Sequence, residues 1–459
     1  MSSGRAASTE AGLFDGVLAR GAVQGAVRDR AWLQAMLDFE AGLARAQARA
    51  GLVSADDAAA IGRACRADDF DAAELGRAAA WTGTPVDGLV RALTAAVGGA
   101  AGDQVHRGAT SQDVLDTAAM LVSRRALRHL IGDLVGAADA AAVLAARHRA
   151  TPMAGRTLLQ QALPITFGLG AAGWMVGLDE AIDRLVAVSG RLAVQLGGAA
   201  GTLASMGEAG IQVVAYLAEE LGLAAPVLPW HTLRTRVAEL AGALGEAAGA
   251  AGKPARDLAL LAQTEVAEVR EGGPRRGGSS SMPHKRNPVA AVSAAACAAR
   301  APGLVASLLA SMVQEHQRAA GAWHAEWRPL AELLESVGAA AAWLRDALEH
   351  LEVDAARMRV NLDATGGMLL AERVTGALAP ALGRLAAHDL VAAACAEAAD
   401  GGRPLAEVLE ARADIRAHLP PAQIRTLLDP ASYLGSALVF VERALAAHAD
   451  AGRRREEDA

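Results

Sequence analysis

Apolar residues recur at the spacing of one face of an α-helix through most of this 459-residue chain. In residues 30–51, for example, Leu33, Met36, Leu37 and Leu43 fall on one such face. No strand-like alternation stands out in residues 1–110, and long helical patterns follow, so we expect an all-α fold. The predicted helices cover residues 30–51, 71–97 with a break at 82–85, 111–130, 158–188, 211–223, 230–252, 258–269, 289–309 and 330–351.

The same pattern divides the chain into three parts. We expect a helical N-terminal domain over residues 1–110 and a central bundle of long helices over residues 111–355, with a mobile loop at residues 270–288. From residue 356, glycine and proline separate shorter helices, which predicts a small C-terminal domain (356–459) ending in a frayed tail. Long helices rich in alanine and glycine usually bury both faces, so the bundle is expected to complete itself by oligomerising. A long monomeric helical array is the alternative, although no internal repeat supports it.

The composition fits close-packed helices and argues against several kinds of partner and site. Apolar residues make up 53% of the chain and aromatic residues only 3%. The net charge of −7 argues against nucleic acid as a partner. The three cysteines, Cys65, Cys297 and Cys395, are too scattered for a disulfide frame or a zinc site. They fit a reducing cytoplasm, as does an N-terminus without an apolar signal core.

Residues 157–178 carry no charge and could be mistaken for a membrane span. Gln160, Gln161 and Pro164 make them a poor lipid-facing helix, so we expect no membrane partner. The better interpretation is a helix buried inside the bundle. Thr151-Pro152 is interpreted as the N-cap and first-turn proline that begin it.

The stretch between residues 272 and 289 combines glycines, three serines and basic side chains, and it contains no acid. Asn287-Pro288 predicts an N-cap followed by a first-turn proline. Lys285 and Asn287 would then lie where free N–H groups and the helix dipole favour an anion. Lys285 is one of only two lysines, with Lys253, which suggests that a compact ammonium is needed there. The alternative is a solvated surface loop.

A second candidate stretch is His106-Arg107-Gly-Ala-Thr110-Ser111-Gln-Asp113, at the start of a predicted helix. Thr110 or Ser111 can cap that helix, and Asp113 stands where a capping partner would. Capping does not explain why His106 and Arg107 come directly before the cap.

The run from Ser279 to Pro288, Ser-Ser-Ser-Met-Pro-His-Lys-Arg-Asn-Pro, resembles the mobile loop of the fumarase/aspartase superfamily. In that family a serine six residues before the lysine is catalytic, and the same count back from Lys285 gives Ser279. The stretch beginning at His106 resembles the family segment that contacts substrate carboxylates. The resemblance covers about residues 14–448. It implies a three-domain α-helical fold and a homotetramer with a twenty-helix core, in which each active site collects segments from three subunits.

Residues 155–160 depart from the family pattern Gly-Arg-Thr-His-x-Gln, in which the histidine helps proton transfer. This sequence has Leu158 there, and a leucine cannot carry a proton. The role is therefore absent, or His106 or His284 supplies it. One branch of the superfamily, the 3-carboxy-cis,cis-muconate cycloisomerases, likewise lacks a histidine at this place.

The block Trp-His-Ala-Glu-Trp at residues 323–327 also resembles that branch. Taken alone, its tryptophans share a helix face and are interpreted as packing residues, with His324 and Glu326 as surface groups. Arg318 is placed to pair with Glu315 across a turn, whereas the family would place it near a substrate carboxylate.

The resemblance implies an isomerase that interconverts 3-carboxy-cis,cis-muconate, a small tricarboxylate, and 4-carboxymuconolactone in protocatechuate (β-ketoadipate) catabolism, without cofactor or metal. A fumarate-releasing lyase of the nitrosuccinate or adenylosuccinate type is the alternative, and a catalytically silent structural protein is a third hypothesis. The expected catalytic residues are Ser279, Lys285, Asn287 and His106. The expected substrate-binding residues are Arg107, Thr110, Ser111, Arg156, Thr157, Gln160, His284 and Arg318.

Overall fold

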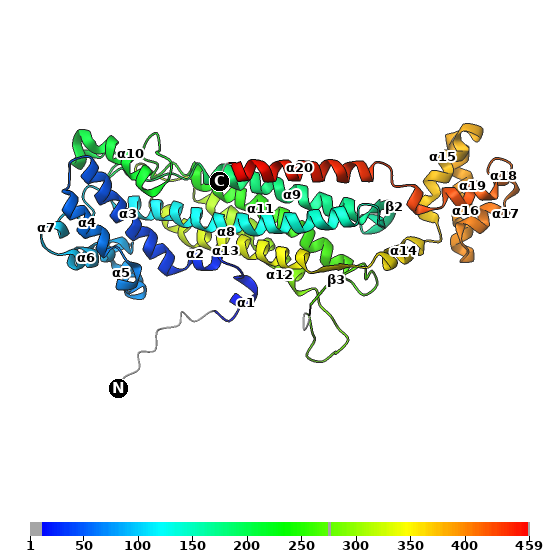
Figure 1. Cartoon of the computed structure of the whole chain (residues 1–459), viewed down its shortest axis with the longest axis horizontal. Coiled ribbons are helices and arrows are strands. Elements are labelled where there is room, and N and C mark those ends of the chain that lie inside the picture. The colour runs from blue at the N-terminus through cyan, green and yellow to red at the C-terminus, as the bar shows by residue number, and fades with distance from the viewer. Residues whose placement is uncertain (1–11, 274–276, 458–459) are drawn as a thin grey trace. The chain divides into compact units, whose positions relative to one another are not determined.

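The computed structural model of the chain describes residues 12–273 and 277–457, and helices dominate it (Figure 1). The long helices are α3 (Asp29–Arg49), α8 (Ser111–Arg147), α9 (Phe167–Ser189), α11 (Thr235–Leu261), α12 (Val289–Ala310), α13 (Ala322–Glu349) and α20 (Ala437–Glu457). The shorter helices before α14 are α1 (Asp15–Leu18), α2 (Val23–Val27), α4 (Ala55–Ala64), α5 (Ala72–Thr82), α6 (Val86–Val97), α7 (Gly99–Gly102) and α10 (Gly210–Leu221). The remaining helices are α14 (Ala355–Asp363), α15 (Ala371–Leu382), α16 (Arg384–Gly401), α17 (Leu405–Ala411), α18 (Ala413–Arg416) and α19 (Pro421–Leu427).

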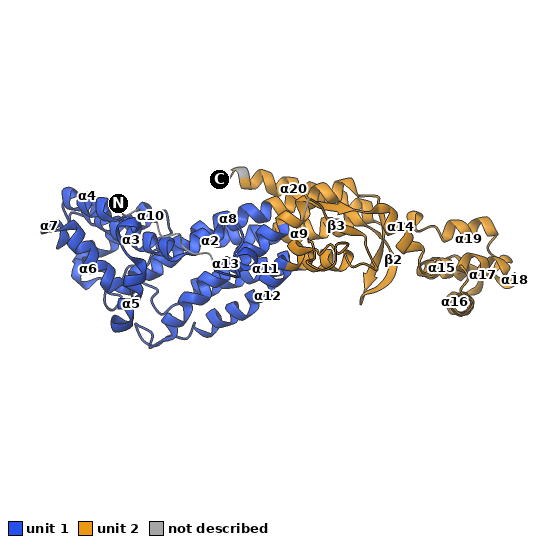
Figure 2. Cartoon of the chain, turned by 90° about the horizontal axis from the view of Figure 1, so that it is seen from below, with its two compact units in different colours: residues 1–135, 180–252, 293–344 blue, residues 136–179, 253–292, 345–459 orange. Residues whose placement is uncertain are grey.

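The chain forms two compact units (Figure 2). Unit 1 contains residues 1–135, 180–252 and 293–344, and unit 2 contains residues 136–179, 253–292 and 345–459. Each unit is built from segments that lie far apart in the sequence. The three-domain division expected from the sequence stays a prediction.

The interior of unit 1 is apolar at the positions that the helical spacing selects. Leu33, Leu37 and Leu43 of α3 are buried, as expected for one face of an amphipathic helix. Leu89 of α6 and Leu121 of α8 are buried as well. Removing such side chains from water is the main favourable term that holds these helices in place.

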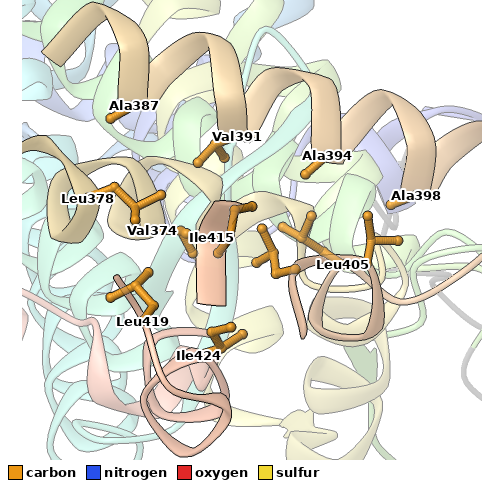
Figure 3. Packing of buried hydrophobic residues seen from close by; sticks show 12 residues of the cluster. Val374, Leu378, Ala387, Val391, Ala394, Ala398, Leu405, Ile415, Leu419 and Ile424 are labelled. Atoms are coloured by element: carbon orange, nitrogen blue, oxygen red, sulfur yellow. The ribbon is translucent and has the colours of Figure 1, made fainter. Parts of the chain in front are cut away.

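Short helices in unit 2 enclose a separate apolar cluster (Figure 3). Val374 and Leu378 of α15 face Val391 of α16, and Ile415 and Ile424 close the cluster from α18 and α19. These side chains are almost completely buried. Helices α15 to α19 therefore share one core.

Residues 152–166 form a β-hairpin, so the helix expected to begin at Thr151 is wrong as far as residue 166. Strand β1 (Pro152–Thr157) pairs antiparallel with β2 (Gln160–Thr166), and α9 begins only at Phe167. A second antiparallel pair joins β3 (Val269–Glu271) to β4 (Leu351–Val353). The hairpin escaped prediction because a short uncharged run does not reveal whether it is strand or buried helix.

Two helices run further than expected. Helix α11 continues through Pro254, where two helices were expected, because Ala251, Ala255 and Leu258 pack it into the interior on both sides of the proline. Helix α20 extends to Glu457, where a frayed tail was expected. Near its end, Arg455 donates a hydrogen bond of 2.9 Å to Asp179.

By length and composition alone, α8 and α12 could each cross a membrane. In both helices, 39% of the most apolar window is buried within the chain. The cores of water-soluble helical proteins contain helices of the same kind. The large apolar side chains of α8 are mostly buried, whereas Val289, Val292 and Leu309 of α12 are exposed.

Candidate active site

The loop between β3 and α12 carries the densest group of candidate residues. We call residues 277–288 the flap loop. It folds back on itself: the Asn287 N–H donates to the Gly277 carbonyl at 2.8 Å, and Gly278 pairs with Arg286 in an isolated antiparallel bridge. Gly277 has φ +65°, and a Cβ there would lie 2.1 Å from the Asn287 carbonyl oxygen. Glycine is therefore required where the loop closes.

Ser279 is half-buried near the start of the flap loop. Its Oγ accepts the N–H of Met282 at 3.2 Å and, more weakly, that of Ser281 at 3.4 Å. Backbone donors aimed at a hydroxyl oxygen stabilise negative charge on it. Among the described residues, Ser280 and Ser281 have no such donors to their hydroxyl oxygens, so the three serines are not equivalent.

The flap loop presents the positive charges of Lys285 and Arg286 to solvent. His284, Lys285 and Arg286 are exposed, and Asn287 is half-buried. No carboxylate in the described part of the chain pairs with Lys285 or Arg286. Both cations are therefore available to an anionic ligand, for which charge-assisted hydrogen bonds are the strong ones.

The N-terminus of α12 is already occupied by a carboxylate of the chain. Glu271 accepts the N–H of Ala291 at 2.8 Å and that of Ala290 at 3.0 Å. These are the donors that an N-cap side chain normally satisfies. The expectation that Asn287 caps this helix and leaves free N–H groups for an anion is therefore wrong. Pro288, which precedes the helix, has no side-chain acceptor, and Glu271 takes over the cap from 19 residues away.

Arg156 of β1 is held by one buried carboxylate. Its guanidinium donates to both carboxylate oxygens of Glu268, at 2.7 and 2.9 Å, and the Glu268 side chain is completely buried. Asn361 donates to the same carboxylate at 2.8 Å. Arg156 was expected to bind a substrate carboxylate, which stays a prediction, and within the chain its charge is paired with that of Glu268. It fixes the hairpin to the segment before β3.

Four exposed residues form the tip of the hairpin. Thr157 pairs with Gln160, and Leu158 and Leu159 make the two-residue turn between them. Both leucines have positive φ, 51° and 65°, and are 97% and 73% exposed. Such a turn normally selects asparagine and glycine, because positive φ strains other residues. Its two apolar side chains point into solvent in the isolated chain.

His106 precedes α8 and contacts a buried carboxylate of α3. Its Nδ1 lies 2.7 Å from Oε1 of Glu40, whose side chain is 1% exposed. Burial lowers the pKa of His106, but the hydrogen bond and charge of Glu40 outweigh burial, so the pKa is raised above its usual value. The protonated imidazolium is favoured. The backbone of His106 is also strained, with φ +60°.

After His106, Arg107 anchors the segment by its side chain, and Thr110 and Ser111 lead into α8. Arg107 is exposed, and its Nη1 donates to the Leu52 carbonyl at 2.7 Å and to Gln104 at 2.9 Å. Thr110 and Ser111 are half-buried at the start of α8. The Thr110 N–H donates to Asp113 at 3.1 Å, which confirms Asp113 as a capping partner.

Asp113 has further hydrogen-bond partners besides the capped end of α8. Its fully buried carboxylate also accepts the N–H groups of Gly197 and Gly198, both at 3.0 Å, and lies 2.6 Å from Nε2 of His231. One carboxylate thus joins the start of α8 to two segments about 85 and 118 residues away. The only local signal was its spacing from Thr110.

Arg318 binds the same glycine segment from its carbonyl side. It donates to the carbonyl oxygens of Gly198 at 2.6 Å and Ala199 at 3.1 Å, and to Gln112 at 2.9 Å. Burial lowers the pKa of Arg318, although Asp113 and Asp116 oppose that shift. The expected pairing with Glu315 is wrong, because Glu315 instead accepts the N–H of Ala320.

Near Arg318 lies a buried ion cluster that the sequence did not predict. Arg234 donates to Asp116 at 2.8 and 3.0 Å and to Glu326 at 3.0 Å, and the indole of Trp323 donates to Asp116 at 3.0 Å. Glu326, expected at the surface, is 3% exposed. The packing role of the tryptophans is confirmed, since the rings of Trp323 and Trp327 meet edge to face at 5.0 Å.

The predicted site residues fall into two groups, one in each unit. Unit 1 holds His106, Arg107, Thr110, Ser111 and Arg318. Unit 2 holds Arg156, Thr157 and Gln160 on the hairpin, and Ser279, His284, Lys285 and Asn287 on the flap loop. No cluster of His, Cys, Asp and Glu side chains among the described residues could hold a metal ion.

Comparison with known proteins decides the family. A family model described as "Lyase" matches residues 18–303, and a second, described as "Adenylosuccinate lyase C-terminus", matches residues 367–444. The chain belongs to the fumarase/aspartase superfamily of lyases. The all-α fold class expected for this superfamily is confirmed.

Three members of the superfamily illustrate the similarity. The 3-carboxy-cis,cis-muconate cycloisomerase of Bradyrhizobium diazoefficiens is 50% identical over 434 residues, which cover 94% of this chain and 96% of the relative. The nitrosuccinate lyase of Streptomyces davaonensis is 49% identical over 453 residues, covering 96% and 95%. The crystal structure of the 3-carboxy-cis,cis-muconate lactonizing enzyme of Pseudomonas putida is 44% identical, with a TM-score of 0.90 over 96% of this chain and 99% of that one.

Proposed function

We propose that this chain is an isomerase that interconverts 3-carboxy-cis,cis-muconate and 4-carboxymuconolactone in protocatechuate catabolism. The structural observation that carries the proposal is the flap loop. It combines a serine held by backbone donors with cations that no described acid neutralises. That combination suits proton transfer to a substrate that carries three carboxylates. Similarity to the cycloisomerase of B. diazoefficiens over nearly the whole chain supports the same conclusion.

The reaction makes two demands on the site. A carboxylate oxygen forms a C–O bond to one alkene carbon, while the neighbouring carbon takes a proton from the enzyme, so the trianion becomes a dianionic lactone. Negative charge builds transiently on the carboxylate beside the protonated carbon. The site must therefore hold a highly charged substrate and place donors or cations where that charge develops.

The flap loop can meet both demands. We assign the proton transfer to Ser279, whose oxygen the N–H groups of Ser281 and Met282 support when it is negatively charged. Lys285 and Asn287 hold the carboxylate on which charge builds. An ammonium is most effective there when closure of the site excludes water, because a low dielectric strengthens the attraction.

The remaining candidates bind the other carboxylates or support those that do. His106, whose raised pKa favours the cation, acts with Thr110 and Ser111. Arg156 and Arg107 bind substrate carboxylates as well, Arg156 beside its partner Glu268 and Arg107 while its Nη1 donates to the Leu52 carbonyl oxygen. The other proposed substrate contacts are Thr157, Gln160, His284 and Arg318.

We also propose that the chain works as a homotetramer whose active sites are shared between subunits. The strained and exposed Leu158–Leu159 turn supports this, because two apolar side chains at the tip of a hairpin would gain by burial against another chain. The exposed apolar side chains of Val289, Val292 and Leu309 on α12 support it as well. The reaction involves no change of oxidation state and needs no cofactor. We place it in the cytoplasm, where the free thiols of Cys65, Cys297 and Cys395 would stay reduced.

Release of nitrite from nitrosuccinate is the second candidate activity. It is favoured by the 49% identity to the lyase of S. davaonensis, nearly equal to the identity with the cycloisomerase. In that reaction a base removes a proton beside one carboxylate, and nitrite leaves from the adjacent carbon to give fumarate. Ser279 and Lys285 could serve both reactions, because each passes through charge on a carboxylate next to the reacting carbon.

A direct comparison of substrates tests the proposal. Purified enzyme is given 3-carboxy-cis,cis-muconate while the diene absorbance is followed, and separately nitrosuccinate or adenylosuccinate while fumarate is followed. We expect kcat/KM for the muconate to exceed the others by at least about 10²-fold, the discrimination that a few well-placed polar contacts provide. Rapid fumarate formation without loss of diene absorbance would exclude the cycloisomerase in favour of the lyase.

A further inference from the structure

The end of β3 and the start of α12, which flank the flap loop, meet at one side chain. Glu271 is the last residue of β3, and its carboxylate binds the N–H groups of Ala290 and Ala291 in the first turn of α12. The chain leaves Glu271, passes through the flap loop and returns to the same carboxylate. A contact that closes a loop of this length removes much of the conformational freedom of its ends.

The β3 end of this contact is itself fixed. Glu271 pairs with Leu351 of β4, and the next N–H, of Gly272, donates to the His350 carbonyl at 2.8 Å. A side chain at Gly272 would be crowded, because its Cβ would lie 3.0 Å from the His350 carbonyl oxygen. The Glu271 carboxylate therefore projects from a well-supported strand toward the helix it binds.

The α12 end depends on Glu271 for its cap. Pro288 stands before the helix without a side-chain acceptor, and Asn287 uses its backbone N–H to close the flap loop onto Gly277. No described residue hydrogen-bonds the Asn287 side chain. Because Glu271 caps the helix, the Asn287 amide is left free to bind a ligand.

We propose that Glu271 is a positioning residue for the proposed reaction: its carboxylate fixes the base of the flap loop and thereby sets the positions of Lys285 and Asn287. This inference rests on the proposed function of the flap loop. Glu271 does not touch the substrate. It also neutralises the positive end of the α12 dipole, so a substrate carboxylate is drawn to the Lys285 ammonium and not to the helix end.

Two variants test this role against a matched control. Glu271→Gln keeps the shape and one acceptor oxygen but removes the charge, and Glu271→Ala removes the cap altogether. The control is Glu352→Gln, on the partner strand β4, where Glu352 pairs with Arg270 in an exposed ion pair. We expect kcat to fall by about 10-fold for Gln and about 10²-fold for Ala, since small displacements of catalytic groups have effects of this size. KM should stay within about threefold, as expected when transition-state contacts are lost. The control should match the wild type.

Amide hydrogen exchange separates positioning from general destabilisation. In Glu271→Ala, exchange should accelerate within residues 277–291 and remain unchanged in α3 and α8. Values of kcat within twofold of wild type in both variants would overturn the proposal, as would faster exchange throughout the protein. If the Ala variant does not fold, the Gln variant decides by the same criteria.

The exchange measurement also keeps the two proposals distinguishable. If the wild type acts on neither the muconate nor nitrosuccinate, the proposed function fails, while exchange still reports whether Glu271 holds the loop. If the wild type is active and the Glu271 variants are equally active, only the positioning role fails.

Discussion

Ser279 differs from the two serines that follow it in one physical respect. Backbone N–H groups point at its oxygen, whereas the described residues direct none at the hydroxyl oxygens of Ser280 and Ser281. Sequence resemblance identified Ser279, Lys285 and Asn287, because the motif is local. It could not identify Glu271, since that residue acts through two N–H groups 19 and 20 positions away. Motifs locate the groups that touch a ligand, and three-dimensional contacts reveal those that hold them.

Replacing Ser279 by alanine should abolish proton transfer with little effect on binding. We expect kcat to fall by at least about 10³-fold, a loss within the range for a general acid or base, and KM to change by less than about threefold. The matched control is Ser280→Ala, which removes an equivalent but unsupported hydroxyl and should leave kcat unchanged. Steady-state kinetics on the muconate measures both. Near-normal turnover of the Ser279→Ala enzyme would remove this residue from the mechanism.

His106 gives a prediction for stability against pH. Its pKa is raised in the folded state, so its pairing with Glu40 stabilises the protein fully below pH 6.5. That contribution is lost as the pH rises through the raised pKa, because the folded state then loses the proton that it had bound more tightly. Urea unfolding at pH 6.0 and pH 8.5 should show a smaller decline with pH in His106→Gln than in wild type. Equal declines would show that the pair does not contribute.

Among the elements, the β1–β2 hairpin departs most from what the sequence predicted. Residues 158–166 are uncharged, and helix and strand have the same signal in so short a run. The hairpin is held by contacts with distant residues, including Arg156 with Glu268 and Gln161 with the Asn361 carbonyl. Helices with strong periodicity and clear breaks, such as α5 and α6 on either side of residues 82–85, were assigned correctly.

A change in the hairpin turn should stabilise the chain and weaken its assembly. In the double variant Leu158→Asn/Leu159→Gly, the turn receives residues that tolerate positive φ, which should relieve strain by about 1 kcal/mol. The same change removes two apolar side chains from the proposed contact with another subunit, weakening association by at least about tenfold. Sedimentation velocity over a concentration series measures the change. Val227→Asn, at an equally exposed apolar position outside the hairpin, is the control. Unaltered association of the double variant would contradict a role in assembly.

At the scale of the whole chain, the sequence indicated the helical class and the family, but not which charges are buried. Arg234 and Glu326 lie in segments that read as ordinary amphipathic helix, yet both are almost fully enclosed. With Asp116 they connect α8, the start of α11 and α13, all within unit 1. Burial of this kind depends on what three distant segments bring together, and no local pattern encodes it.

Removing Arg234 should therefore lower the free energy of unfolding. Arg234→Met leaves Asp116 and Glu326 buried without their shared cation, and we expect a loss of about 3–5 kcal/mol in the free energy of unfolding. Adding Asp116→Asn and Glu326→Gln should recover much of that loss, because the uncompensated charges are then gone. Denaturant unfolding of the single and triple variants measures both effects. A single variant as stable as the wild type would mean that the ion cluster does not stabilise unit 1.

The capped end of α12 has a consequence for inhibitor design. An anionic compound aimed at that helix terminus would meet a resident acid and be repelled by it. Tight-binding mimics of the reaction's enediolate should instead be built outward from the Lys285 ammonium and the Asn287 amide, with a flat, doubly charged head group and no appendage reaching toward Ala290.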